Sequence, residues 1–78
     1  MSETLGDRMR MHRARLRMSQ SELGGKVDLS TNSISAIEKG HVDPKVSVMK
    51  RIATALGVKV SYLIGEDKES EQLPAAVA

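Results

Sequence analysis

The chain has 78 residues, enough for one compact domain but not for two. It has no cysteine and only two histidines, which excludes disulfides and thiolate chemistry, and we expect neither a metal centre nor a cofactor. No apolar run approaches the roughly 20 residues that cross a bilayer, and the amino-terminal residues lack the order of a secretory signal. We therefore expect a cytoplasmic domain that is stabilised by packing alone and does not contact a membrane.

The charge is unevenly distributed along the chain. Four carboxylates and one lysine follow Gly65, so residues 1–65 carry 11 basic and six acidic side chains, a net charge of +5. This charge, with five arginines between positions 8 and 17, favours an anionic partner such as nucleic acid, although a solvated helix face can have the same composition. Tyr62 is the only aromatic residue, which favours duplex DNA over modules that stack single-stranded bases on several rings.

The first helix is predicted over residues 3–16. Apolar residues recur at helical spacing along the chain, and no stretch alternates long enough to predict a strand, so the fold class is all-α. One stripe of the first helix contains Leu5, Met9, His12 and Leu16. Residues 66–78 show no such pattern and are predicted to be a disordered tail, which leaves a single domain over residues 1–65.

The second helix is predicted over residues 20–27. Ser19 and Glu22 have the spacing of a capping box, in which each side chain satisfies a free backbone donor at the start of a helix. The adjacent Gly24 and Gly25 weaken this helix by about 1 kcal/mol each relative to alanine. We expect them to permit close approach of another helix.

Three further helices follow. Ser30 predicts the N-cap of a third helix over residues 31–39, whose isoleucines point inward, and Gly40 supplies a left-handed stop. A fourth helix that ends at Gly57 is marked by Met49, Ile52, Ala53 and Leu56. Ser61 is predicted to cap a short fifth helix that runs through Ile64.

The second and third helices have the features of a major-groove reader. They are joined by a turn of about three residues, and small polar side chains open the third helix. Asn32 has the groups to pair with an adenine edge, Thr31 offers a hydroxyl and a methyl group, and Ala36 can touch a thymine methyl. Such residues at a helix start also serve simply as caps, so the pattern alone leaves both interpretations open.

The sequence resembles the Cro and phage-repressor helix-turn-helix family, also called XRE-type, over residues 5–64. The resemblance is carried by Leu5-Gly6, Arg13, the run Met18-Ser19-Gln20-Ser21-Glu22-Leu23, Ile34-Ser35, Ile37-Glu38-Lys39-Gly40, Pro44, Ile52-Ala53 and Ala55-Leu56-Gly57-Val58. It implies a five-helix, lambda-repressor-like domain in which helices two and three form the DNA-binding unit.

The resemblance also implies roles for individual residues. Base edges would be read by Thr31, Asn32, Ser35 and Ala36. Phosphates would be contacted by Gln20, Ser33, Lys39, His41 and Arg17. Arg13 and Glu38 match a pair that forms a partly buried salt bridge between helices one and three. Arg17 and Asp28 stand where the family often has glycine, so both are expected to adopt a left-handed conformation.

Dimerisation follows from the target as well as from the family. One helix reads too few base pairs, whereas two helices related by a two-fold axis read half-sites one turn apart. The candidate dimer surface is an apolar cluster of Val58, Val60, Tyr62, Leu63 and Ile64, although some of these residues could instead close the core.

The sequence therefore predicts a sequence-specific double-stranded DNA-binding regulator that binds an inverted-repeat operator as a homodimer, as a repressor, an activator or a restriction-modification controller. The alternative is an antitoxin-like module whose main task is to bind a partner protein, with the tail after Gly65 as the binding segment. An enzyme is not expected, because no nucleophile has a nearby base, and the glycines at 24 and 25 do not have phosphate-loop spacing.

Overall fold

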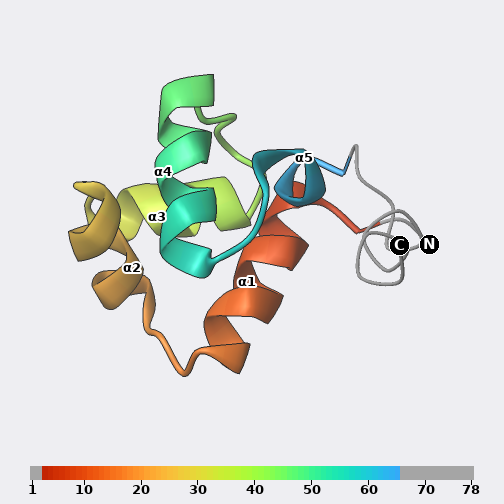
Figure 1. Ribbon diagram of the computed structural model, residues 1–78. Coiled ribbons are helices and arrows are strands. Elements are labelled where there is room, and N and C mark those ends of the chain that lie inside the picture. The colour runs from red at the N-terminus through yellow and green to blue at the C-terminus, as the bar shows by residue number, and fades with distance from the viewer. Residues whose placement is uncertain (1–2, 66–78) are drawn as a thin grey trace.

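The computed structural model describes residues 3–65, which form five helices and no strand (Figure 1). The helices are α1 (Leu5–Arg15), α2 (Gln20–Val27), α3 (Thr31–Glu38), α4 (Val46–Leu56) and α5 (Val60–Leu63). The predicted all-α, five-helix class is confirmed. None of the helices in this part of the chain is long and apolar enough to span a membrane. The predicted disorder of residues 66–78 lies outside the described residues.

Capping side chains determine where the first three helices begin. α1 starts at Leu5 and not at the predicted position 3, because the Thr4 hydroxyl accepts the Asp7 N–H at 3.1 Å and the Asp7 carboxylate accepts the Thr4 N–H in return. α2 has the predicted capping box, with both Ser19–Glu22 hydrogen bonds at 2.9 Å. α3 begins after Ser30 as predicted, and the Ser30 hydroxyl accepts the Ser33 N–H.

The predicted cap of α5 is wrong. The N-cap residue is Lys59, whose side chain makes no capping hydrogen bond, and Ser61 lies within the helix. With only four residues, α5 is too short to be stable by itself. It is held by packing against α1 and α4, with Leu63 fully buried between them.

The turns after α1 and α2 each contain a left-handed residue that is not glycine. Arg17 and Asp28 adopt φ angles of 54° and 62°, as the comparison with the family pattern predicted. Aspartate tolerates this region better than arginine does, because its short side chain can bond locally. Gly40, with φ at 81°, supplies the predicted left-handed stop after α3.

The core receives side chains from all five helices. The largest fully buried side chains belong to Met9, Leu23, Val27, Ile34, Ile52 and Leu63. Leu16, which the predicted stripe placed on the inner face of the first helix, is 50% exposed. The reason is that α1 ends at Arg15, so that Leu16 lies in the turn that leads to Arg17 rather than on the helix face.

Two glycines allow backbones to approach closely. A Cβ on Gly6 would lie 1.9 Å from the carbonyl oxygen of Glu38, so α1 and the end of α3 can pack only because Gly6 has no side chain. A Cβ on Gly24 would lie 2.4 Å from the carbonyl oxygen of Leu29. The neighbour of Gly24 is therefore the turn after α2 and not another helix, and Gly25 has nothing within 4 Å. The predicted helix contact at these two glycines is wrong.

Candidate nucleic-acid interface

α2 and α3 pack against each other around a tight turn. The left-handed Asp28 reverses the chain after α2, and the Leu29 N–H donates to the Gly24 carbonyl at 2.8 Å. Leu23 and Ile34, one from each helix, are fully buried in the common core. The outer face of α3 is thereby held at a fixed angle to the amino terminus of α2.

The outer face of α3 carries the predicted base-reading residues together. Thr31 and Asn32 are exposed, and Ser35 and Ala36 are half-buried one turn further along. Within residues 3–65, the side chains of Thr31, Asn32 and Ser35 form no hydrogen bond. Their donors and acceptors are thus free for an external ligand, which is the arrangement that readout of base edges requires.

Ser33 differs from these residues, because it contributes to the cap of α3. The Ser30 hydroxyl donates to the Ser33 hydroxyl at 3.0 Å and also accepts the Ser33 N–H. Ser33 is half-buried and lines a groove beside α3.

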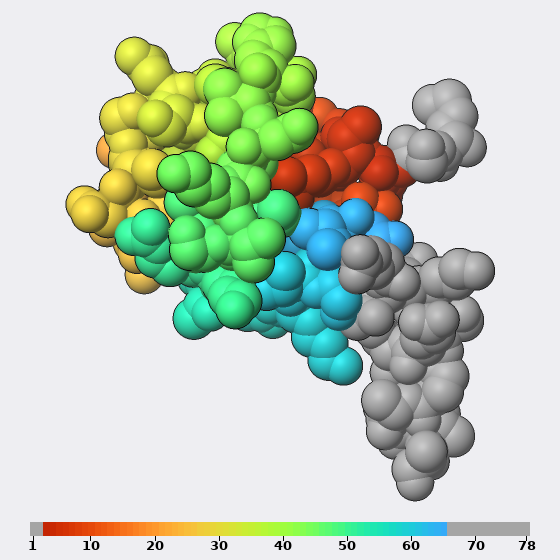
Figure 2. Space-filling model, turned by 90° about the horizontal axis from the view of Figure 1, so that it is seen from above, coloured from red at the N-terminus to blue at the C-terminus, as the bar shows by residue number. Residues whose placement is uncertain are grey.

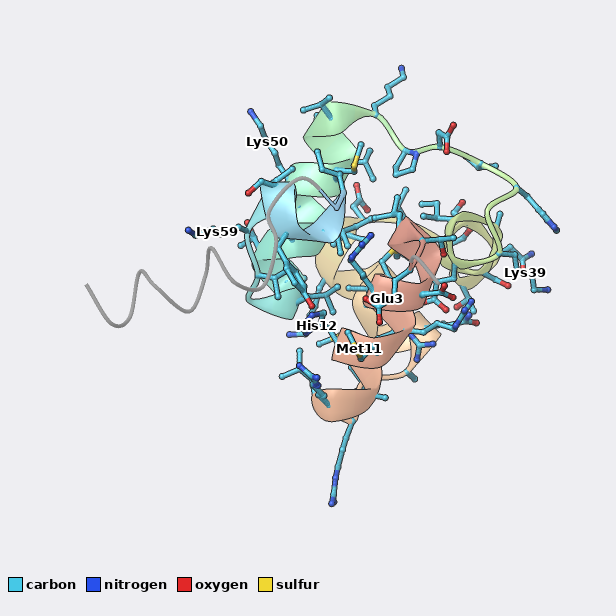
Figure 3. The ribbon with its side chains drawn as sticks, turned by 90° about the vertical axis from the view of Figure 1, so that its right-hand side faces the viewer. Glu3, Met11, His12, Lys39, Lys50 and Lys59 are labelled. Atoms are coloured by element: carbon cyan, nitrogen blue, oxygen red, sulfur yellow. The ribbon has the colours of Figure 1, made fainter. Side chains whose placement is uncertain are left out.

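The predicted phosphate-contacting residues lie at two ends of the unit. Lys39 and His41 are exposed where the chain leaves α3, and Arg17 is exposed before α2. Figure 3 shows Lys39 extending from one side of the molecule, whereas Lys50 and Lys59 extend from the opposite side. The sequence did not distinguish these lysines by their orientation.

Gln20, the fifth phosphate candidate, is half-buried at the first position of α2. Its Nε2 donates to Glu38 Oε1 at 3.0 Å, an interaction that sequence reasoning missed because the two residues are 18 positions apart. This bond fixes the Gln20 amide beside the free backbone N–H groups at the start of α2, where the helix dipole favours an anion.

Glu38 is the centre of a buried polar network. Arg13 Nε donates to Glu38 Oε2 at 2.7 Å and Arg13 Nη2 donates to Oε1 at 3.0 Å, with the side chains 17% and 1% exposed. The structure thus joins the two residues of the predicted salt bridge in a bidentate pair. The hydrogen bonds to Glu38 raise the pKa of Arg13, so the guanidinium keeps its charge.

Two further bonds of the network were not predicted. Arg13 Nη1 donates to the Met18 carbonyl at 2.9 Å, and Arg10 Nη1 donates to the Glu38 carbonyl at 3.0 Å. The spacing of Arg10 and Arg13, three residues apart on α1, is the signal that could have indicated a shared partner.

Two of the five residues in the apolar cluster that the sequence offered as a dimer surface are buried. Leu63 is 0% exposed and Tyr62 is 9% exposed, so these two residues belong to the core and not to the surface. Tyr62 also packs edge to face on His12, with ring centroids 5.3 Å apart. Val58 and Val60 are half-buried against the core, and Ile64 is 36% exposed. The cause is the packing of α5 on α1 and α4, which covers the inner side of the cluster.

Two short helices joined by a tight turn, with a free polar face on the second, define a helix-turn-helix domain. A family model described as helix-turn-helix matches residues 9–63. The chain therefore belongs to the helix-turn-helix family of XRE type, whose members are DNA-binding transcriptional regulators and not a class of enzymes. Among residues 3–65, no group of three metal-ligating side chains comes together.

Similar proteins come from phages and from archaea. The chain is 33% identical over 64 residues to the immunity repressor protein of Bacillus phage phi105, covering 82% of this chain and 44% of that protein. It is 36% identical over 64 residues to an uncharacterised HTH-type transcriptional regulator of Methanocaldococcus jannaschii, covering 81% of this chain and 97% of that protein. The chain spans about half the length of the first two curated relatives that it matches.

The fold is similar to that of a phage repressor bound to DNA. The crystal structure of the P22 c2 repressor protein in complex with a synthetic operator aligns with a TM-score of 0.80 and 29% sequence identity. The alignment covers 85% of this chain and 100% of that chain.

Proposed function

We propose that the chain is a sequence-specific regulator that binds double-stranded DNA by placing α3 in the major groove. The observation that carries this proposal is the outer face of α3, where the side chains of Thr31, Asn32 and Ser35 have no hydrogen-bond partner in the described part of the chain. A recognition helix needs such groups at its leading turns, because each base pair presents a distinct pattern of donors and acceptors there. The operator-bound P22 c2 repressor, which has the same fold, supports the proposal.

The proposed contacts divide into two kinds. Asn32, with Thr31, Ser35 and Ala36, reads base edges and so determines sequence preference. Lys39, His41, Arg17, Ser33 and Gln20 hold phosphates and so determine position and salt dependence.

The regulator is proposed to act as a homodimer on an inverted repeat. One α3 reads only a few base pairs, and each correct base pair contributes about 1–3 kcal/mol of discrimination. Two copies related by a two-fold axis double the readout and fix the half-site spacing at about 10 base pairs or a multiple. Ile64, with the outer parts of Val58 and Val60, is the remaining candidate for the contact between copies.

The first experiment selects bound duplexes from a random DNA pool and sequences them. Enrichment of an inverted repeat supports the dimeric regulator and yields its operator. If no sequence is enriched at moderate salt, the proposal is wrong, and the chain is better explained as a module that binds a partner protein.

Two variants then separate readout from phosphate contact. Asn32→Ala is expected to cost about 1–3 kcal/mol on the selected operator and little on random DNA. Lys39→Ala is expected to weaken binding to all duplexes and to reduce the slope of log K against log salt by about 1. Lys50→Ala is the matched control, because that exposed lysine extends from the opposite side (Figure 3) and its loss should leave both quantities unchanged.

A further inference from the structure

A groove of about 560 Å³ lies between α3 and the segment that follows it. It is lined by Asn32 and Ala36 of α3, by Val42, Asp43 and Pro44 of the connecting segment, and by Val48 of α4. Figure 2 shows the yellow surface of α3 beside the green surface of this segment and of α4. The groove is therefore continuous with the face of α3 that is proposed to read bases.

Val42 is a solvent-exposed apolar side chain at the edge of this face. It is 50% exposed and lines the groove together with Ala36, and the neighbouring His41 N–H donates to the Ala36 carbonyl at 2.9 Å, which holds the segment against α3. The segment from His41 to Lys45 is not helical, and Pro44 restricts the backbone there. Val42 is thus presented at a defined position rather than on a free loop tip.

The chemistry of the groove favours the edge of a base over a phosphate. Its charged lining residues, Asp43 and Lys45, have opposite signs, so they give the groove no net positive charge. The other lining side chains are apolar apart from Asn32 and Ser33, and Ser33 is the single proposed phosphate contact among the residues that line the groove. In the major groove, the apolar feature of a base pair is the 5-methyl group of thymine.

We propose that Val42 and Ala36 enclose the 5-methyl group of one thymine in each half-site, which makes Val42 a specificity-determining residue outside the helix-turn-helix. This inference rests on the proposed function. It places part of the sequence readout in the connecting segment, with Ala36 as one wall of the methyl site and Val42 as the other.

The test removes single methyl groups from the selected operator. Each thymine is replaced in turn by deoxyuridine, which retains base pairing, and the dissociation constant is measured by fluorescence anisotropy at fixed salt. One thymine per half-site is expected to show about a fourfold loss for the wild-type chain, the effect of exposing one buried methyl group. With Val42→Ala, the same replacement should change affinity by less than about twofold.

Val46→Ala is the matched control. Val46 is 61% exposed and lies four residues from Val42, but it is not among the residues that line the groove. This variant should retain the wild-type sensitivity to deoxyuridine, and thermal unfolding should show that both variants are folded.

The proposal is overturned if no deoxyuridine replacement changes the dissociation constant, or if the half-site contains no thymine. It is also overturned if Val42→Ala shows the same loss of affinity on deoxyuridine replacement as the wild-type chain. In each of these cases the operator is still selected and bound, so the proposed function stands. Failure of the proposed function would instead appear at the earlier stage, as a selection without an enriched sequence.

Discussion

Replacing Arg13 by alanine would leave the buried Glu38 carboxylate with one neutral hydrogen-bond donor, the Gln20 amide. Removing one partner of a buried ion pair costs about 3–5 kcal/mol. Because the Arg13 side chain is 17% exposed, water can reach part of the vacated space, and we expect the lower value, about 3 kcal/mol. A domain of this size is stable by about 3–9 kcal/mol, so Arg13→Ala removes a large part of its stability.

Urea unfolding and thermal unfolding, both followed by the helical circular dichroism signal, measure the effect. A loss of about 3 kcal/mol corresponds to a fall in Tm of about 12–24 °C for a domain of this size. Arg15→Ala is the matched control, because Arg15 is an exposed arginine on the last turn of the same helix. Its replacement should change stability by no more than about 0.5 kcal/mol.

The double variant Arg13→Ala with Glu38→Ala tests the cause of the loss. It removes the stranded charge, so it should be destabilised by less than the sum of the two single variants. If Arg13→Ala unfolds at the same urea concentration as Arg15→Ala, or if the double variant shows the full sum, the carboxylate is not stranded and the reasoning is refuted.

Two further predictions concern glycine and histidine positions. Gly6→Ala should destabilise the domain by about 1–3 kcal/mol, because its Cβ would collide with the Glu38 carbonyl, whereas Gly25→Ala, with nothing near it, should stabilise α2 by up to about 1 kcal/mol. Equal melting temperatures for the two variants would contradict the close approach. Burial lowers the pKa of His12 below its usual 6.5, so the unfolded chain binds its proton more readily. Stability should therefore fall as the pH drops from 7.5 to 5.5, and His12→Phe should lose most of the dependence of Tm on pH. If the pH dependence of this variant is unchanged, it arises from another titrating group.

The helix boundaries that the sequence predicted correctly are those with local signals. The capping box of Ser19 and Glu22 and the N-cap of Ser30 act within four residues, so the sequence contains all the information that they need. α1 begins two residues later than predicted, because Thr4 and Asp7 form an equivalent box at its start. α5 has no local cap, and its position depends on packing, so the assigned cap was wrong.

In the candidate site, too, some features follow from the local sequence and others depend on tertiary packing. The residues on the outer face of α3 could be predicted, because helical periodicity and the turn before it place them together. The burial of Leu63 and the exposure of Val42 depend on how distant helices pack, and no local pattern distinguishes a core valine or leucine from a surface one. The bond from Gln20 to Glu38 likewise requires the tertiary structure.

That bond also affects how Gln20 can contact DNA. A side-chain amide has two N–H donors and one acceptor, and Glu38 takes one of the donors. A phosphate offers only acceptors, so Gln20 can bind it through its second N–H while the first remains on Glu38. Arg13 holds the same carboxylate from α1, which means that one buried residue of α3 positions both the proposed phosphate donor of α2 and the proposed recognition helix. The ion pair is therefore part of the proposed binding geometry as well as of the core.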